Sequence, residues 1–186
     1  MKRHEITLLG YALLGLLHNK PSSGYELRKI FTETPLGGYS DSPGAIYPAL
    51  RRLVERKLAQ GSVVGGPGLR QRNVLSLTAE GETELKKWLT QPVKRAEVSG
   101  KLPELMLRFA FLEGVAGPCE TIRFLESFAA EVRLYLPEIK EFLKSRAAHY
   151  PVAGRLALEN GILGYEAQLT WATQAMDAYR NGENAR

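Results

Sequence analysis

The residues best suited to do chemistry lie in a short basic stretch near residue 50. Tyr47, Arg51, Arg52 and Glu55 fall between apolar residues at helical spacing, so a helix that buries the apolar stripe turns these four to solvent. An arginine can grip a guanine edge or a phosphate, and a tyrosine hydroxyl near a helix start can donate to a phosphate. The pattern indicates a helix that enters the major groove of double-stranded DNA by its N-terminal half. An ordinary solvated helix face is the alternative at this point.

A second basic group, Arg70 and Arg72, lies beside the glycine-rich stretch 65–68. Two short β-like runs, 60–64 and 73–77, flank this region and predict a hairpin with a basic tip. From such a tip the two arginines could reach the DNA backbone or a minor groove. The glycines do not predict a nucleotide site, because no Lys-Ser or Lys-Thr follows them and no helix opens there.

Residue patterns for catalysis and metal binding are missing from the sequence. His4, His18 and His149 are scattered, without a His-Glu-x-x-His motif or a Cys or His pair at metal-ligand spacing. Cys119 follows Pro118 near an expected helix start and is interpreted as structural, and there is no Gly-x-Ser-x-Gly elbow. The sequence therefore predicts no enzyme, no cofactor and no metal.

Periodicity and capping residues predict the elements that position the basic residues. The apolar run at 6–17 has helical spacing, and Ser23 with Glu26 forms a capping box for a second helix. The third helix opens in the segment 42–44, and Thr78 can cap a fourth helix after the hairpin. Three helices, a hairpin and a fourth helix are the order of a winged helix-turn-helix.

Length and charge favour a polyanionic partner for the first part of the chain. The 186 residues suit one domain or two small ones. Residues 1–91 carry 13 basic and 8 acidic side chains and the remainder carries 12 of each, so the net charge of +5 lies in the first part. The apolar run at 6–17 is shorter than the roughly 20 residues of a membrane span, and no cleavage site follows it. With a single cysteine, this predicts a cytoplasmic protein that does not bind a membrane.

The second part of the chain is predicted to be helical. Residues 92–102 carry proline, glycine and charge without a sustained period, and are interpreted as a linker. Helices are expected from 103 to 112, from 118 to 143 with a kink at Pro137, and over about 152–181.

The last helix carries an apolar seam at alternating steps of four and three residues. Such a seam predicts a coiled-coil-like contact with another helix, either as core or as a dimer interface. Trp171 lies off the seam and is the best candidate in this helix to line a site for a flat aromatic ligand. The seam consists of Leu158, Ile162, Tyr165, Leu169, Ala172, Met176 and Tyr179.

Several motifs resemble the PadR family of bacterial transcriptional regulators. The pattern Gly161-x-x-x-Tyr165 before Trp171 is similar to the longer C-terminal domain of that family. The stronger motifs are Ala12–Leu17, Ser23–Leu27, Ser42–Leu53, Leu75–Gly81 and Trp88-Leu89.

The element order and the resemblance together predict a mainly α fold, with a winged helix-turn-helix over 1–91 and a helical dimerisation domain, which could also bind an effector, over 103–182. The resemblance implies a homodimer that binds an inverted-repeat operator, usually as a repressor, and that in some members is released by a phenolic or other aromatic small molecule. The residues that it places on DNA are Tyr25, Ser42, Tyr47 and Arg51, with Arg70 and Arg72 in the wing.

Two other functions fit the same residues. The basic surface could serve an acidic partner protein, with only non-specific binding to DNA. Alternatively, the helical part could be a ligand-binding or catalytic bundle beside a DNA-binding half that has lost its role.

Overall fold

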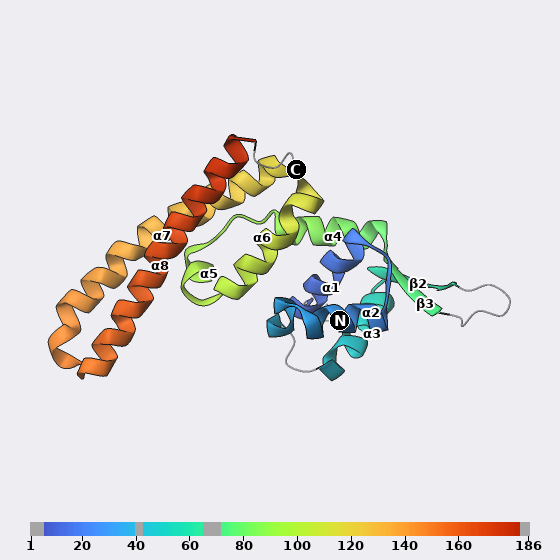
Figure 1. Cartoon of the computed structure of the whole chain (residues 1–186), viewed down its shortest axis with the longest axis horizontal. Coiled ribbons are helices and arrows are strands. Elements are labelled where there is room, and N and C mark those ends of the chain that lie inside the picture. Colours follow the sequence, from blue (N-terminus) through green and yellow to red (C-terminus); the bar gives the residue numbers. More distant parts are fainter. Residues whose placement is uncertain (1–5, 40–42, 65–71, 183–186) are drawn as a thin grey trace. The chain divides into compact units, whose positions relative to one another are not determined.

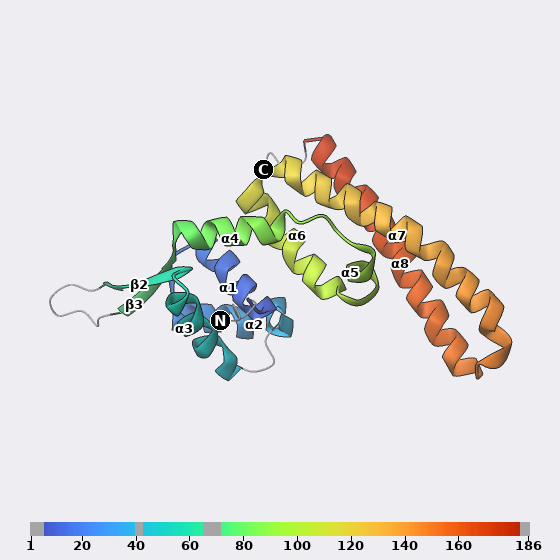
Figure 2. The same ribbon diagram turned by 180° about the vertical axis from the view of Figure 1, so that it is seen from behind.

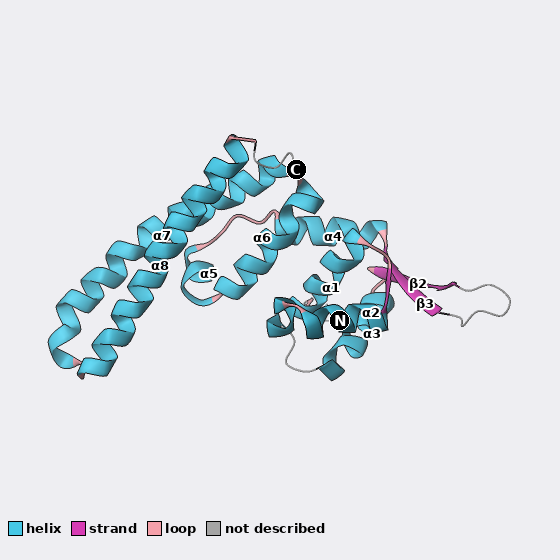
Figure 3. Cartoon of the chain, viewed as in Figure 1, coloured by secondary structure: helices cyan, strands magenta, loops and turns pink. Residues whose placement is uncertain are grey.

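The computed structural model shows a mainly helical chain with one small sheet, which confirms the predicted fold class (Figures 1 and 3). It describes residues 6–39, 43–64 and 72–182 and divides the chain into two compact units, Met1–Leu89 (unit 1) and Thr90–Arg186 (unit 2). Within these described residues, no helix is long and apolar enough to cross a membrane. The same residues contain no cluster of three His, Cys, Asp or Glu side chains that could hold a metal ion.

Unit 1 is built around its first helix, which touches two other helices and a strand. Leu13 and Leu14 of this helix are fully buried. The predicted capping box is confirmed: the Ser23 hydroxyl accepts a hydrogen bond from the Glu26 amide (3.3 Å), and the Glu26 carboxylate accepts one from the Ser23 amide (2.7 Å). The helices of unit 1 are α1 (Leu8–Asn19), α2 (Gly24–Glu33), α3 (Ile46–Glu55) and α4 (Ala79–Leu89), with 3₁₀ turns at Pro35–Tyr39 and Pro43–Ala45.

The predicted hairpin is confirmed as the wing of unit 1, which extends away from the helices in Figure 1. Its strands β2 (Ala59–Val64) and β3 (Arg72–Leu77) pair antiparallel, with Val64 opposite Arg72. A third strand, β1 (Ser22–Ser23), pairs with the other edge of β3 and gives the order β1-β3-β2. Periodicity cannot predict a strand of two residues. The hairpin tip, 65–71, lies outside the described residues.

The root of the wing is held tightly against α4. The Thr78 hydroxyl caps α4 as predicted, accepting from the Gly81 amide (3.0 Å), and donates to the Lys57 carbonyl (2.7 Å). The Thr78 amide in turn donates to the Leu58 carbonyl (3.2 Å). A Cβ atom at Gly81 would lie 2.0 Å from that Leu58 oxygen, so only glycine fits this contact.

The longest helices of unit 2 form a hairpin. Its helices α7 and α8 run side by side and antiparallel in both views (Figures 1 and 2). Ion pairs join Lys140 to Glu166 and Arg180 to Glu126 across the two helices. The helices of unit 2 are α5 (Arg95–Gly100), α6 (Leu102–Ala116), α7 (Pro118–Arg146) and α8 (Val152–Arg180), with a 3₁₀ turn at Ala147–His149.

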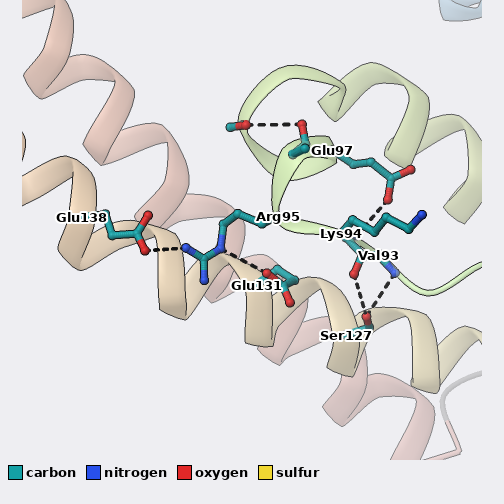
Figure 4. Close-up of polar contacts among 9 residues, drawn as sticks. Val93, Lys94, Arg95, Glu97, Ser127, Glu131 and Glu138 are labelled. Carbon is teal, nitrogen blue, oxygen red and sulfur yellow. Dashed lines mark hydrogen bonds and ion pairs between the residues drawn. The ribbon is translucent and has the colours of Figure 1, made fainter.

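The interpretation of 92–102 as a linker is wrong, because this segment contains α5 and is fastened to α7. Figure 4 shows the Arg95 guanidinium between Glu131 (3.1 Å) and Glu138 (2.6 Å) of α7. The Val93 amide donates to the Ser127 hydroxyl (3.1 Å), and the side chain of Val98 is buried. These partners lie more than thirty residues away in the sequence, where a local pattern cannot reveal them.

Two further features of unit 2 concern a proline within α7 and a buried arginine in α6. Helix α7 continues through Pro137 as one helix, and the kink expected at this proline stays a prediction. Arg108, within an otherwise apolar stretch of α6, is almost fully buried. Its guanidinium bonds to the Gln91 carbonyl, lies 3.7 Å from the Glu97 carboxylate and sits over the Phe124 ring. Burial lowers the pKa of this guanidinium, while the nearby carboxylate opposes that change.

The predicted seam of α8 packs in large part against its own chain. Ile162, Ala172 and Met176 are buried there, so these three offer no free surface to a second copy. The Tyr165 ring contacts Tyr135 of α7, and the Tyr179 hydroxyl donates to the Glu113 carboxylate (2.7 Å). The role of Leu158, Tyr165, Leu169 and Tyr179 in a dimer stays a prediction.

Candidate nucleic-acid interface

Helix α3 forms because one side of it is strongly apolar. The side chains of Ile46, Ala49, Leu50 and Leu53 are all buried. Pro48 occupies the third helical position, where a backbone amide would have no partner inside the helix, so it does not disturb the first turn. The predicted geometry of this helix is therefore confirmed, with its polar side turned away from the core.

The polar side of α3 presents Tyr47 and Arg51 together. Half of the Tyr47 surface and three quarters of the Arg51 side chain are exposed. Arg51 lies one turn after Tyr47 and hence on the same side, whereas Arg52 is turned about 100° further round the helix. The Arg51 Nε lies 3.8 Å from the Glu55 carboxylate one turn further on. Arg52 is exposed but belongs to the other flank of the helix.

The start of α2 lies next to the start of α3. Tyr25, the second residue of α2, is 70% exposed. The residue before it, Gly24, lies directly against the Tyr47 ring: a Cβ at Gly24 would be 2.8 Å from Tyr47 Cε1. The structure thus brings these two tyrosine positions, which are 22 residues apart in the sequence, to one place on unit 1.

The wing joins the same region through β1. Ser23, the N-cap of α2, pairs with Val74 in β3, two residues after Arg72. The hydrogen bonds of Glu26 with Ser23 lower the pKa of the Glu26 carboxyl, and the positive charges of Lys20 and Arg72 act in the same direction. Arg72 is exposed at the outer end of the described part of the wing. Its charge therefore lies close enough to the start of α2 to belong to one basic surface.

Two of the predicted site residues, Ser42 and Arg70, lie outside the described residues. Sequence reasoning missed one residue of the interface, Gly24. The signal was present, because glycine in the first helical turn lowers helix stability and marks a close approach of neighbouring atoms.

The fold and the exposed residues define a class of protein. Unit 1 has a helix with a buried apolar side and an exposed tyrosine and arginines, a preceding helix that abuts its start, and a basic two-stranded wing. Together these elements form a winged helix-turn-helix, a class of domain that commonly binds DNA.

Comparison with known proteins shows what this domain is similar to. The sequence model of the transcriptional regulator PadR-like family matches residues 13–87, within the winged-helix region, which confirms the resemblance seen in the motifs. The negative transcriptional regulator PadR of Bacillus subtilis (strain 168) is 33% identical over 89 residues, which make up 46% of this chain and 48% of that relative. The match spans about half the length of the curated relative.

Solved structures of similar proteins are more distant in sequence. A crystal structure of Bacillus subtilis PadR in complex with operator DNA is 21% identical, with 94% of this chain and 99% of that chain covered and a TM-score of 0.43. A crystal structure of Bacillus subtilis PadR in complex with p-coumaric acid is 20% identical, with 96% and 98% covered and a TM-score of 0.42.

Proposed function

We propose that this chain is a transcriptional regulator that binds double-stranded DNA sequence-specifically through unit 1, as a dimeric repressor of an inverted-repeat operator. The observation that carries the proposal is the exposed Tyr47 and Arg51 side of α3 within the region 13–87 that matches the PadR-like family. The net charge of +5, which lies wholly in residues 1–91, supports a polyanionic partner.

The exposed residues divide into two roles on DNA. Arg51 projects from the middle of α3, the helix that would enter the major groove in a helix-turn-helix protein, and its fork suits a guanine edge. Tyr25 and Tyr47 carry hydroxyls that suit phosphate oxygens, and Arg72 supplies a charge for the backbone beside the groove. The phosphate contacts fix position, while the base contact of Arg51 provides sequence preference.

Binding can be tested by fluorescence anisotropy with a labelled DNA fragment from upstream of the protein's own gene and a shuffled fragment. Measurements at low and near-physiological salt separate specific binding from phosphate binding. Arg51→Ala should cost about 1–3 kcal/mol on the preferred fragment alone. Arg51→Lys keeps the charge without the fork and should also lose preference. Lys87→Ala is the control, because it removes the same charge from an exposed position on α4.

The two outcomes of this titration have different meanings. If Arg51→Ala lowers affinity for the preferred fragment only, the chain reads bases through α3. If the wild-type protein binds both fragments equally and loses both at higher salt, specific regulation is refuted for that fragment. A genome-wide binding selection that also finds no preferred sequence would favour the alternative of a winged-helix module for an acidic partner protein.

Dimerisation through unit 2 is the second part of the proposal. The described α7–α8 hairpin carries large apolar side chains that a single chain leaves exposed, and exposed apolar groups of this kind are typical of interfaces. A two-fold dimer would present two α3 helices about one DNA turn, roughly 34 Å, apart. These exposed side chains are Leu134, Val152, Leu156 and Leu163.

Light scattering after size-exclusion chromatography tests the dimer. Leu163→Asp introduces a charge at one of these exposed apolar positions and should yield monomers with unchanged helix content by circular dichroism. Thr173→Asp is the matched control, since it adds the same charge at an exposed polar position on a different side of α8. Dimers that survive Leu163→Asp at micromolar concentration would exclude this face as the interface.

Regulation by an aromatic small molecule is the third part of the proposal, with Trp171 at its site. Trp171 is half-buried, and its ring meets Phe109 (5.0 Å between centroids) and Phe128 (6.1 Å) edge to face. Such a cluster suits a flat aromatic ligand, provided that a ring can enter among these side chains. Titration with a phenolic acid should quench Trp171 fluorescence and weaken DNA binding at the same concentration. Unchanged fluorescence with a panel of such acids would refute the Trp171 site.

A further inference from the structure

Gly24 of α2 lies directly against α3, the candidate recognition helix, and its lack of a side chain allows this close approach. A Cβ there would lie 2.8 Å from Cε1 and 3.4 Å from Cδ1 of Tyr47, whereas Leu50 Cδ1 would be in ordinary contact at 3.5 Å. Approaches below 3.0 Å are essentially never made by real Cβ atoms. The backbone at Gly24 does not have a positive φ, so glycine is not needed there for its conformation.

The nature of the crowding atom decides what a substitution would change. At Gly81 the crowding atom is a backbone oxygen of the fold, which cannot move alone. At Gly24 it is a ring atom of Tyr47, a side chain that is half exposed and free to turn about its own bonds. An added methyl group at Gly24 would therefore displace the tyrosine and leave the packing of unit 1 in place.

Displacing the Tyr47 ring changes either the position or the direction of its hydroxyl. Rotation about the Cα–Cβ bond moves the hydroxyl further than Cε1, because the hydroxyl lies beyond that atom. Rotation about the Cβ–Cγ bond leaves the hydroxyl oxygen on the axis but turns the ring plane, in which the O–H bond lies. Relieving the 2.8 Å contact therefore shifts the hydroxyl or redirects its hydrogen bond. Hydrogen bonds weaken steeply with such changes in length and direction.

We propose that Gly24 is a positioning residue for DNA recognition: its missing side chain holds the space for the Tyr47 ring and so sets where the Tyr47 hydroxyl meets DNA. This inference rests on the proposed function, because Tyr47 must contact DNA for its placement to matter. Gly24 itself contributes no polar side chain to the contact and acts through Tyr47.

The test is a double-mutant cycle with Gly24→Ala, Tyr47→Ala and the double variant of the full chain. Affinity is measured for the preferred and shuffled DNA fragments. We expect Gly24→Ala to weaken binding to the preferred fragment roughly tenfold, the value of one hydrogen bond to a charged phosphate. In the Tyr47→Ala background, where the crowding ring is gone, Gly24→Ala should have no further effect.

The melting temperature distinguishes this positioning role from a purely structural one, because only a structural role would lower it. Alanine favours helix over glycine, so Gly24→Ala should leave the melting temperature of unit 1 unchanged or raised. A lowered melting temperature, or an equal loss of binding in the Tyr47→Ala background, would overturn the proposal. So would binding by Gly24→Ala equal to that of the wild type.

A nuclear Overhauser measurement separates this inference from the proposed function. Protons of Gly24 and of the Tyr47 ring should give a strong cross-peak in the free protein, which Gly24→Ala removes. If the wild-type protein shows no DNA preference at all, the proposed function fails and the role of Gly24 in recognition fails with it. If the wild type has a preference and the cross-peak is absent, only the inference about Gly24 is refuted.

Discussion

Gly81→Ala should destabilise unit 1 more than any gain in helix propensity can offset. Its Cβ would lie 2.0 Å from the Leu58 carbonyl oxygen and 2.9 Å from the Leu58 carbonyl carbon. Relief to a normal separation requires α4 and the chain after α3 to move apart by more than an ångström. That movement would break the bonds of Thr78 to the Leu58 carbonyl (3.2 Å) and the Lys57 carbonyl (2.7 Å).

The size of the effect follows from these contacts. Two lost hydrogen bonds cost about 2 kcal/mol together. Overpacking of a close contact costs about 1–3 kcal/mol, and the better helix propensity of alanine returns about 1 kcal/mol. We therefore expect a loss of about 2–4 kcal/mol in the free energy of unfolding of unit 1. For a unit of this size, each kcal/mol lowers the melting temperature by roughly 4–8 °C.

The chain has two tryptophans, one in each unit, which allows unit 1 to be followed alone. In a Trp171→Phe background, the fluorescence of Trp88, buried and stacked on Tyr11 at 4.1 Å, reports the unfolding of unit 1 in urea. Gly38→Ala, in the 3₁₀ turn of unit 1, is the control, because nothing lies within 4 Å of its added Cβ. A Gly81→Ala variant as stable as the wild type would refute the claim that this contact requires glycine.

Three other perturbations have defined outcomes. Glu55→Gln should raise DNA affinity two- to fivefold, because it removes a negative charge beside the phosphates and releases Arg51. Exposed ion pairs of this type are worth about 0.2–1 kcal/mol. A lower affinity, measured by anisotropy, would contradict this. Arg108→Met should lower the free energy of unfolding of unit 2 by about 3–5 kcal/mol, because the partners of the buried guanidinium are left without it. Urea unfolding followed by Trp171 fluorescence measures this loss, and a value under about 1 kcal/mol would contradict the reasoning. Burial, with the Glu113 bond, raises the pKa of Tyr179 from 10.0 to about 12. Because this folded-state pKa is raised, Tyr179 stabilises unit 2 below pH 10 and loses that contribution as the pH rises toward 12. Tyr179→Phe should flatten this fall in unfolding free energy, and an unchanged profile would assign it to another group.

Capping residues and short periodic stripes were predictable because the interactions behind them are local. The Ser23 capping box, the Thr78 cap and the buried stripe of α3 each join residues within a few positions of one another. Capping hydrogen bonds and the burial of one helix face each follow a fixed residue spacing that is the same in any protein. The candidate site was predictable to the same extent, since the exposed side of α3 follows from its buried side.

Short elements were missed because distant partners create them. Strand β1 has two residues and exists because β3, about fifty residues later, offers it a free edge. Helix α5 has six residues and is held by Arg95 between two carboxylates of α7. Neither segment is long enough to show a period in the sequence.

The apolar seam of α8 shows another kind of contact that residue spacing predicts only in part. Its spacing correctly predicts a contact with another helix, but it does not say whether that helix belongs to the same chain. The structure packs α8 against α7 and buries Ile162, Ala172 and Met176 within the unit, while Leu156 and Leu163 of α8 stay exposed. Apolar side chains have no directional preference for one partner, so only the packing of the whole unit decides between them.

The amino-acid sequence by itself determined the winged-helix order of unit 1, the exposed basic side of α3 and the PadR-like character of the region 13–87. These features depend on residue identity and local spacing. Only the tertiary structure decided that α2 meets α3 with Gly24 beneath the Tyr47 ring, and that Arg108 is buried beside Glu97. Such contacts join residues far apart in the chain, and their geometry is set by how the helices pack.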